Sequence, residues 1–535
     1  MNEDFVREMT DAYTFKGNSF IAGGAMLAGL CQTGTMVRIP LKTLNRHGLI
    51  AGATGTGKTK TLQCVAEQLA ENGVPCLLMD IKGDLSGIAA SGSTHPKIEE
   101  RHQKIGESFT PGKSTAEFYT LSDEKGARLR TTVLEFGPIL FSKILELNET
   151  QESIIAILFK FCDDKQLPLL DLQDFKKVLH YLSNEGKEEM EKEYGQISSA
   201  SVGTILRKVI QLEQQGADQF FGEPSFDVED LCRYDENGKG IVSIVRLTDM
   251  QDKPKLFSTF MLQMLAEIYA TFPEEGDIEQ PKLAIFIDEA HLVFENATDA
   301  LKDQLEIIIK LIRSKGVGIF FITQSPDDIP EEILGQLGLK IQHALRAFTA
   351  KDRKAIKLAA ENFPPSPYYK TDELLTSMGI GEALISVLNE KGIPTPLVHT
   401  LLCAPKSRMD ILTESEIDAI VGNSYIVKKY EQSVDRESAY EILTEKIEDA
   451  QEEEHQKKIQ EQRQKATQTQ TKSRSNRREK SFMEQVFNSS ASRQVGRTLA
   501  REVTRGILGA LGVKSTTRRR RTTKKVSSPF DILFK

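Results

Sequence analysis

The chain has 535 residues, of which 39% are hydrophobic and 27% are charged, enough for two or three domains with a real core. No apolar run approaches the ~18 residues of a membrane span, and the acidic, polar start MNEDFVREMT is not a secretory signal. The six cysteines lie singly, without a CxxC pair, which is typical of the reduced thiols of a cytoplasmic protein.

The net charge of −8 conceals an asymmetry along the chain. Residues 472–525 hold 16 Lys or Arg against three Glu, which leaves a net charge of −21 for the rest. A basic C-terminal segment on an acidic chain predicts that this segment binds an acidic partner, and nucleic acid is the first candidate. A solubilising tail that binds nothing is the alternative.

The first half of the chain alternates strand and helix patterns. Residues 1–43 are expected to form a short, β-rich N-terminal segment, and residues 44–410 the main domain. A buried strand is expected at 47–52, followed by a helix with apolar residues at helical spacing and a second strand at 74–84. Strand, loop, helix and strand in this order form the unit of a parallel sheet.

A helical insertion interrupts this alternation. A strand is expected at 130–137, and helical patterns with cap signals then cover about 138–235. The sheet resumes afterwards, with strands expected at 240–247, 283–291, 317–324 and 340–348 and helices at 255–272 and 299–316. Residues 382–402 predict a hairpin that turns at Asn-Glu-Lys-Gly. The predicted fold class is therefore α/β, with a mainly parallel sheet.

The end of the chain is polar and charged. Residues 411–465 are expected to form a charged helical segment, and residues 466–535 a basic, partly disordered tail. Within the tail, residues 492–512 predict an amphipathic helix with an arginine every four residues beside an apolar face. Such a helix also suits an anionic membrane surface, so nucleic acid and membrane both stay open as its partner.

The stretch GATGTGKT, between the first strand and its helix, has the spacing of a phosphate-binding loop. Its glycines allow backbone N–H groups to face phosphate oxygens, and the following helix adds its positive N-terminal end. Lys58 is placed to reach the β- and γ-phosphates, and Thr59 to bind Mg²⁺. The nucleotide-binding set is expected to be Gly52, Ala53, Thr54, Gly55, Thr56, Gly57, Lys58 and Thr59.

An acidic pair ends the apolar run in LAIFIDEAH. Asp288 and Glu289 follow a predicted strand at its carboxyl end, where parallel sheets bind ligands. Asp288 is expected to hold Mg²⁺, and Glu289 to act as the base that polarises a water molecule against the γ-phosphate. His291 is expected to be a coupling residue and not a metal ligand. No guanine-reading NKxD motif is present, which favours ATP over GTP.

Two further residues are candidates for the same chemistry. Gln324 ends the next predicted strand, where it can sense or orient the attacking water or can simply cap the strand. Arg313 ends the helix before that strand and can act as an arginine finger in a neighbouring subunit, or as a cation favoured at a helix C-terminus. Arg346 and Arg353 are further candidates for the finger.

Five segments together resemble the HerA–FtsK superfamily of ring ATPases, closest to its bacterial HerA-like (YjgR-type) branch: NRHGLIAGATGTGKTKTLQ, MDIKGDLSG, RTTVLEFGP, FIDEAHLVF and RSKGVGIFFITQSP. The resemblance covers about residues 40–405. It implies a RecA-like core, Mg²⁺-dependent ATP hydrolysis, a homo-oligomeric ring such as a hexamer, and pumping of duplex DNA. It also implies the roles of the Walker A pair Lys58 and Thr59, the Walker B pair Asp288 and Glu289, the sensor Gln324 and the trans-acting Arg313.

The chain departs from HerA proper before the phosphate loop. Only about 40 residues precede the first strand of the core, fewer than the β-barrel of HerA requires. A nuclease partner that docks on such a barrel is therefore in doubt. Two functions follow from the sequence: an ATP-driven helicase or translocase on duplex DNA, or a regulatory or scaffold ATPase whose insertion and charged tail bind proteins. The net negative charge outside the tail repels DNA and therefore favours the regulatory or scaffold ATPase, unless the central pore of the ring is locally basic.

Overall fold

Two compact units make up the computed structural model, which describes residues 2–470 except 252, 277, 296–298, 433 and 435. The first unit comprises Met1–Arg130, Gln215–Phe220 and Pro224–Ser433. The second comprises Thr131–Gln214, Phe221–Glu223 and the described residues from Val434 onward. No helix in the described part of the chain is long and apolar enough to cross a membrane.

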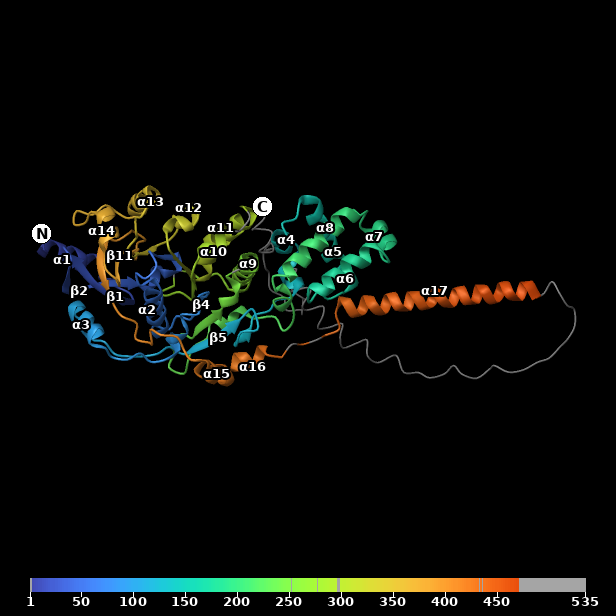
Figure 1. The fold of residues 1–535 in the computed structure, drawn as a ribbon, viewed down its shortest axis with the longest axis horizontal. Helices are drawn as coiled ribbons and strands as arrows, with labels where there is room; N and C mark the ends of the chain where they lie inside the picture. The colour runs from blue at the N-terminus through green and yellow to red at the C-terminus, as the bar shows by residue number, and fades with distance from the viewer. Residues whose placement is uncertain are drawn as a thin grey trace, which may run out of the picture. The chain divides into compact units, whose positions relative to one another are not determined.

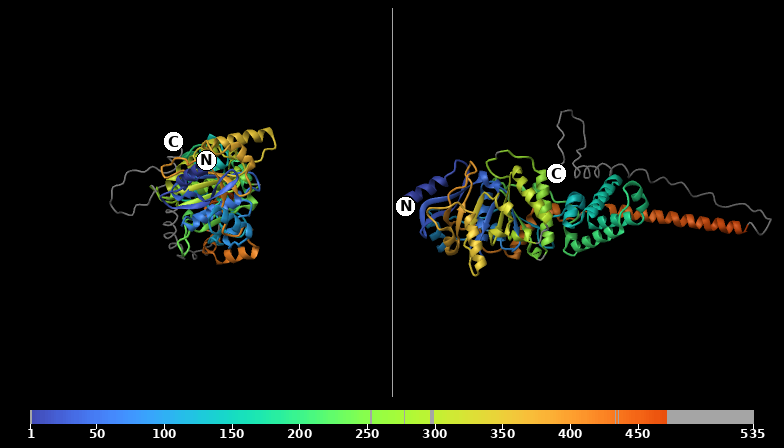
Figure 2. Two further views of the ribbon diagram at one scale, coloured as in Figure 1. Left: turned by 90° about the vertical axis from the view of Figure 1, so that its left-hand side faces the viewer. Right: turned by 90° about the horizontal axis from the view of Figure 1, so that it is seen from above.

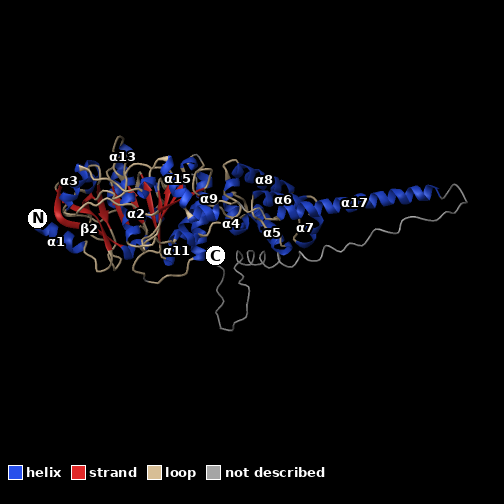
Figure 3. Cartoon of the chain, turned by 90° about the horizontal axis from the view of Figure 1, so that it is seen from below, coloured by secondary structure: helices blue, strands red, loops and turns tan. Residues whose placement is uncertain are grey.

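The first unit is built on a sheet of twelve described strands, drawn in red in Figure 3. Their order is β2-β1-β12-β11-β10-β3-β9-β8-β4-β7-β5-β6. Every pairing from β10 to β6 is parallel, and every pairing from β2 to β10 is antiparallel. The strands are β1 (Ser19–Leu27), β2 (Leu30–Pro40), β3 (Gly48–Ala51), β4 (Cys76–Asp80), β5 (Ala116–Thr120), β6 (Ala127–Arg128), β7 (Val242–Arg246), β8 (Leu283–Ile287), β9 (Val317–Thr323), β10 (Leu339–Gln342), β11 (Glu382–Ser386) and β12 (Val398–Leu402). The predicted mainly parallel α/β class is confirmed.

The order of the central strands positions the candidate site. β9 pairs with β3 on one side and with β8 on the other. All three are fully buried, which explains their nearly uninterrupted apolar sequences. Because they run parallel, the loops after their carboxyl ends leave the sheet at the same edge, next to one another.

The N-terminal segment belongs to the same sheet. The one or two short strands expected there are the long strands β1 and β2, and β1 pairs antiparallel with β12. Helix α1 (Asn2–Ala12) was not predicted; it buries Phe5 and Met9 in the main core. The hydroxyl of Tyr13 donates hydrogen bonds to the carbonyls of Ile385 and Pro396, at 3.0 and 2.7 Å, which ties this segment to the hairpin of β11 and β12.

Helices lie on both sides of the sheet (Figure 3). In α2, the apolar residues Leu62, Val65, Ala66 and Leu69 are buried in the main core, as their spacing predicted. The helices of this unit are α1, α2 (Lys58–Glu71), α3 (Pro96–Ile105), α9 (Pro254–Thr271), α10 (His291–Phe294), α11 (Asp299–Ile312), α12 (Glu331–Leu334), α13 (Ala350–Glu361), α14 (Thr371–Ser377), α15 (Glu414–Asn423) and α16 (Tyr425–Tyr430). The sequence patterns did not predict α3, α13 or α14, nor the short strands β5 and β6.

The second unit is helical. Its described helices are α4 (Val133–Ile144), α5 (Glu149–Lys165), α6 (Leu172–Ser183), α7 (Lys187–Glu193), α8 (Ser199–Glu213) and α17 (Ala439–Gln470). Aromatic rings fill its interior; the ring centroids of Phe141 and Phe175 are 4.7 Å apart. The helical patterns predicted for this region are present, and the long C-terminal helix α17 joins them through Asp174, which accepts a hydrogen bond of 2.9 Å from the Tyr440 backbone.

The strand predicted at 130–137 is wrong. Thr132 forms a capping box with Glu135: its hydroxyl accepts from the Glu135 backbone at 3.1 Å, and the Glu135 carboxylate accepts from the Thr132 backbone at 3.0 Å. This cap starts α4, which bends at Gly137, a residue with φ 74°. The capping box outweighed the β-branched residues that had favoured a strand.

The structure also changes one boundary at the end of the chain. Helix α17 continues through residues 466–470, where the sequence had predicted disorder. The rest of the predicted basic tail, including the amphipathic helix expected at 492–512, lies outside the described residues.

Candidate active site

The loop between β3 and α2 has the backbone of a phosphate cradle. Gly52 adopts φ 152° and Gly57 φ 111°, which residues with a side chain rarely adopt. A Cβ atom at Gly52 would lie 2.5 Å from the Cβ atom of His343. Both the torsion angle and the close neighbour therefore require glycine at this position.

Lys58 lies in the curve of this loop. Its ammonium donates hydrogen bonds to the carbonyl oxygens of Gly52 and Ala53, at 2.6 and 3.2 Å. Burial lowers the pKa of Lys58, and the charge of Lys82 lowers it further, against the opposite effect of Glu289 and Asp288. The lysine therefore lies within electrostatic reach of the acidic pair, although 230 residues separate Lys58 from Asp288 in the sequence.

Asp288 and Glu289 follow β8 at the same edge of the sheet, and both are buried. Within the described residues, Oδ2 of Asp288 has no hydrogen-bond partner. Burial raises the pKa of Asp288 to about 6; Lys82 opposes this rise, and Glu289 adds to it. Glu289 has φ 46°, in the left-handed region that side chains other than glycine occupy at a cost of roughly 1–3 kcal/mol.

Lys82, which the sequence argument did not single out, completes this cluster. Its ammonium forms an ion pair with Oε1 of Glu289, while Oε2 of Glu289 lies 3.2 Å from Nδ1 of His291. Partial burial lowers the pKa of Lys82, but the charges of Asp288 and Glu289 outweigh it and raise the pKa above its ordinary value. The signal available in the sequence was its position just after a predicted strand; that this strand, β4, pairs with β8 became known only from the structure.

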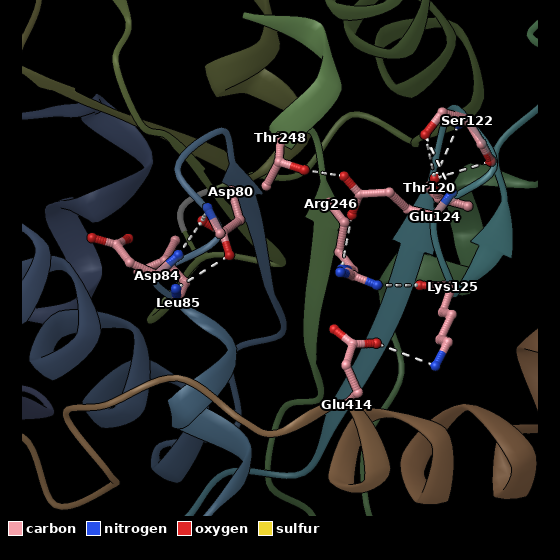
Figure 4. A network of polar contacts seen from close by, with 11 residues as sticks. Asp80, Asp84, Leu85, Thr120, Ser122, Glu124, Lys125, Arg246, Thr248 and Glu414 are labelled. Carbon is pink, nitrogen blue, oxygen red and sulfur yellow. Dashed lines mark hydrogen bonds and ion pairs between the residues drawn. The ribbon is translucent and has the colours of Figure 1, made fainter.

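Asp80, the last residue of β4, holds the loop that carries Lys82. Its carboxylate accepts three backbone hydrogen bonds, from Gly83 at 2.8 Å, Asp84 at 3.1 Å and Leu85 at 3.2 Å. Figure 4 shows the bonds from Asp84 and Leu85. Burial raises the pKa of Asp80 to about 7 despite these bonds. The polar network continues along this edge, where Arg246 forms an ion pair of 3.0 Å with Glu124 (Figure 4).

The end of β9 lies between the phosphate loop and the acidic pair. The backbone N–H of Gly52 donates to the carbonyl of Thr323 at 3.2 Å, and that of Ala290 donates to Ile322 at 2.9 Å. These two bonds tie the phosphate loop and the residues after β8 to the end of β9. Gln324, the next residue, is exposed at this point. The structure therefore places the sensor candidate at the same edge as Lys58 and Glu289.

His343 is a second residue that the sequence argument missed. It follows β10, and its Nε2 atom forms a hydrogen bond of 2.9 Å with the hydroxyl of Thr61 in α2. Burial lowers the pKa of His343 to about 4, and the charge of Lys58 contributes to the shift. A neutral imidazole under the loop packs against Gly52 and Gly57 and keeps the loop in place.

Arg313 lies at the opposite edge of the sheet. It directly precedes β9, whose seven residues span roughly 20 Å between the two edges. There Arg313 lines a cavity of about 510 Å³ together with three other cations, Arg46, Lys310 and Lys340. Partial burial lowers the pKa of Arg313, and the neighbouring charge of Arg46 lowers it further. The structure therefore does not bring Arg313 to the phosphate loop of its own chain.

The residues at the carboxyl edge fit Mg²⁺ and a nucleoside triphosphate. The unpartnered Oδ2 atom of Asp288 and the half-buried hydroxyl of Thr59 are hard oxygen donors of the kind that Mg²⁺ binds. Lys58 and the first turn of α2 supply positive charge beside a loop in which a side chain at Gly52 would fill the space.

The chain is similar to a described protein family and to archaeal DNA repair helicases. The family described as "Helicase HerA-like C-terminal" matches residues 27–517. The DNA double-strand break repair helicase HerA of Sulfolobus acidocaldarius is 23% identical over 385 residues, which cover 70% of this chain and 69% of that protein. HerA of Saccharolobus solfataricus is 22% identical over 371 residues, 68% of this chain and 66% of that protein.

Among solved structures, the bacterial conjugative coupling protein TrwBdeltaN70 is 14% identical, with a TM-score of 0.48, and the match covers 76% of this chain and 94% of that one. The match to the family model, residues 27–517, covers more than half of the chain. The chain therefore belongs to the HerA-like C-terminal helicase family.

Proposed function

We propose that the protein is an ATP-hydrolysing motor that acts on double-stranded DNA. The observation that carries the proposal is the convergence of Lys58, Asp288, Glu289 and Gln324 at the carboxyl edge of one parallel sheet. The family and the printed names of its archaeal relatives, DNA double-strand break repair helicases, support DNA as the substrate.

Each residue has a chemical task in this proposal. Lys58 binds the β- and γ-phosphate oxygens, and Thr59 and Asp288 hold Mg²⁺, which neutralises charge on the phosphates when bound. Glu289 accepts the proton of the attacking water, and Gln324 orients that water from the end of β9. The nearly complete burial of Glu289 keeps bulk water from competing for its carboxylate.

The cavity at the opposite edge supports assembly into a homo-oligomeric ring. Arg313 and Arg46 lie side by side there, in a lining that includes four cations. In a ring, this edge of one subunit meets the nucleotide of the next, where a guanidinium stabilises charge developing on the γ-phosphate. It stays a prediction that the ring has six subunits, that the chain belongs to the YjgR-type branch, and that a membrane surface is a partner. A nuclease partner is not proposed.

DNA-dependent hydrolysis tests the proposed function. Duplex DNA should stimulate ATP turnover by the full chain, and the stimulation should decrease as salt rises, because phosphate contacts release counterions. Glu289→Gln serves as the control that should bind ATP without turning it over. Hydrolysis that depends on Glu289 but does not respond to DNA at any salt concentration would leave the alternative, an ATPase that acts on protein partners, which the acidic body of the chain favours.

A further inference from the structure

Helix α13 presents a cationic face. Its buried side, formed by Ile356 and Ala359, packs into a small core with Leu345, Leu375 and Leu384. With 3.6 residues per turn, the opposite side points to solvent. The exposed residues on that side include four cations: Lys351, Arg353, Lys354 and Lys357. Helix α13 lies at the outer margin of the first unit, beside α12 and α14 in Figure 1, and it also lies at the margin in both views of Figure 2.

The loop before α13 adds an aromatic ring to this face. Phe348 is 87% exposed, and Arg346 beside it is exposed as well. The loop is held by the helix cap, because the Asp352 carboxylate accepts hydrogen bonds of 2.8 Å from the backbone N–H groups of both Phe348 and Thr349. The one carboxylate inside the cationic run is thus engaged with the backbone, and the ring is presented from a defined position. We call Arg346, Phe348, Lys351, Arg353, Lys354 and Lys357 the α13 face.

The α13 face is connected to the candidate active site. Burial raises the pKa of Asp327, and the neighbouring Asp328 raises it further, whereas the charge of Lys351 lowers it. Because Lys351 acts on Asp327 in this way, it lies close to the turn after β9. In that turn, Asp328 accepts hydrogen bonds from the Thr323 hydroxyl and, at 3.0 Å, from the Ser325 backbone. A polyanion on the face would therefore lie near the turn that follows the strand end carrying Gln324.

We propose that the α13 face binds the phosphate backbone of duplex DNA, with Phe348 packed against a sugar of the same strand. Five cations beside an exposed aromatic ring supply the two contacts that a duplex backbone offers, charge for phosphates and an apolar ring for sugars. The face is locally basic on a body with a net negative charge, so charge complementarity favours a polyanion at this place. The proposal rests on the proposed function, because it assigns a surface to its DNA substrate.

Removal of three charges tests the proposal in the full chain. The triple variant Arg353→Gln, Lys354→Gln and Lys357→Gln should bind a short fluorescent duplex roughly 10- to 100-fold more weakly at about 0.1 M salt, and the salt slope of log Kd should become shallower by about 2–3. A control variant loses the same charge elsewhere in the first unit, by Lys97→Gln, Lys104→Gln and Lys113→Gln, which are exposed in and after α3. The control should match the wild type.

Phe348→Ala separates the aromatic contact from the charges. It should weaken DNA binding about tenfold and leave the salt slope unchanged, because no phosphate contact is lost. Phe348→Ala and the control variant should keep wild-type ATP turnover in the absence of DNA, which shows that they fold. For the triple variant, thermal unfolding at the wild-type temperature shows that it folds. Wild-type DNA affinity and slope in the triple variant would overturn the assignment of this surface and point to an acidic protein as its partner. If the wild-type chain itself binds no DNA, the proposed function fails, and this proposal fails with it.

Discussion

At the scale of single residues, Lys82 balances the charge of the acidic pair. Asp288 and Glu289 are both buried, and two buried carboxylates side by side oppose each other's ionisation. The Lys82 ammonium opposes the rise in the pKa of Asp288 and pairs with Glu289. Because Mg²⁺ binds an ionised carboxylate, this lysine would extend the pH range in which Asp288 holds the metal of the proposed function.

Lys82→Met should therefore shift the acid limb of the pH–rate profile. The Asp288 pKa, about 6 with Lys82 present, should rise when the ammonium is removed, so that activity is lost at a higher pH, by roughly 1 unit. ATP turnover measured from pH 5 to 9 at a fixed, limiting Mg²⁺ concentration, where protons and metal compete for Asp288, gives the midpoint. Lys82→Arg should keep the wild-type limb, and so should Lys125→Met, which removes a lysine paired with Glu414 and Asp418. If the acid limb of Lys82→Met has the wild-type midpoint, Lys82 does not control the pKa of Asp288.

At the scale of elements, the phosphate loop depends on its neighbours in the sheet. β3 ends between β9 and β10, and the residues that follow it bond to both neighbours. Gly52 donates to the carbonyl of Thr323, the last residue of β9, and Ala53 donates to the carbonyl of Ala344, after β10, at 2.9 Å. His343 lies against Gly52 with no space for a side chain. The loop is thus held by backbone bonds and packing in addition to its own glycines.

Gly52→Ala should abolish tight nucleotide binding. The new Cβ would lie 2.5 Å from that of His343 and would force a side chain into φ 152°. We expect ATP affinity to fall more than tenfold and stability to fall by about 1–3 kcal/mol, as for other strained backbone positions. Titration calorimetry and thermal unfolding measure the two effects. Gly422→Ala, in α15 with open space around the position, should keep the wild-type ATP affinity and should not lower stability. Wild-type ATP affinity in Gly52→Ala would refute the proposed cradle.

At the scale of the whole molecule, the two halves of the proposed catalytic set lie at opposite edges of one sheet. Lys58 and Glu289 follow the carboxyl ends of their strands, whereas Arg313 precedes the amino end of β9. A separation of roughly 20 Å prevents Arg313 from acting on the nucleotide of its own chain in this structure. If the arginine takes part in hydrolysis, the complete site must therefore be shared between copies of the chain.

A mixing experiment tests this sharing. Arg313→Ala should bind ATP and assemble but hydrolyse roughly 10³–10⁵ times more slowly. Mixed with Glu289→Gln, it should recover part of the activity, because some interfaces then pair an intact Glu289 with an intact Arg313. Subunit exchange is followed by fluorescence transfer between labelled chains. Exchange without any recovery of turnover would assign Arg313 to its own subunit, as a cap of its helix or a lining residue of the cavity.

Local sequence patterns predicted the elements that carry the phosphate loop and the acidic pair. The positions of Gly52, Gly57 and Lys58 and the apolar run before Asp288 predicted a loop and a strand that the structure contains. The same reasoning was wrong at 130–137, where a capping box between Thr132 and Glu135 was mistaken for part of a strand. It also missed α13, whose apolar side is narrow beside its many charges.

By itself, the sequence determined the phosphate loop, the acidic pair and the mainly parallel sheet, because each depends on residue types at fixed spacing within one short segment. Only the tertiary structure decided that Lys82 joins Glu289, that His343 lies against Gly52, and that Arg313 lies at the far edge with Arg46. These neighbours come from strands far apart in the sequence. Their side chains meet because the order of strands in the sheet, which hydrophobic spacing does not encode, brings the ends of β4, β8 and β10 beside the phosphate loop.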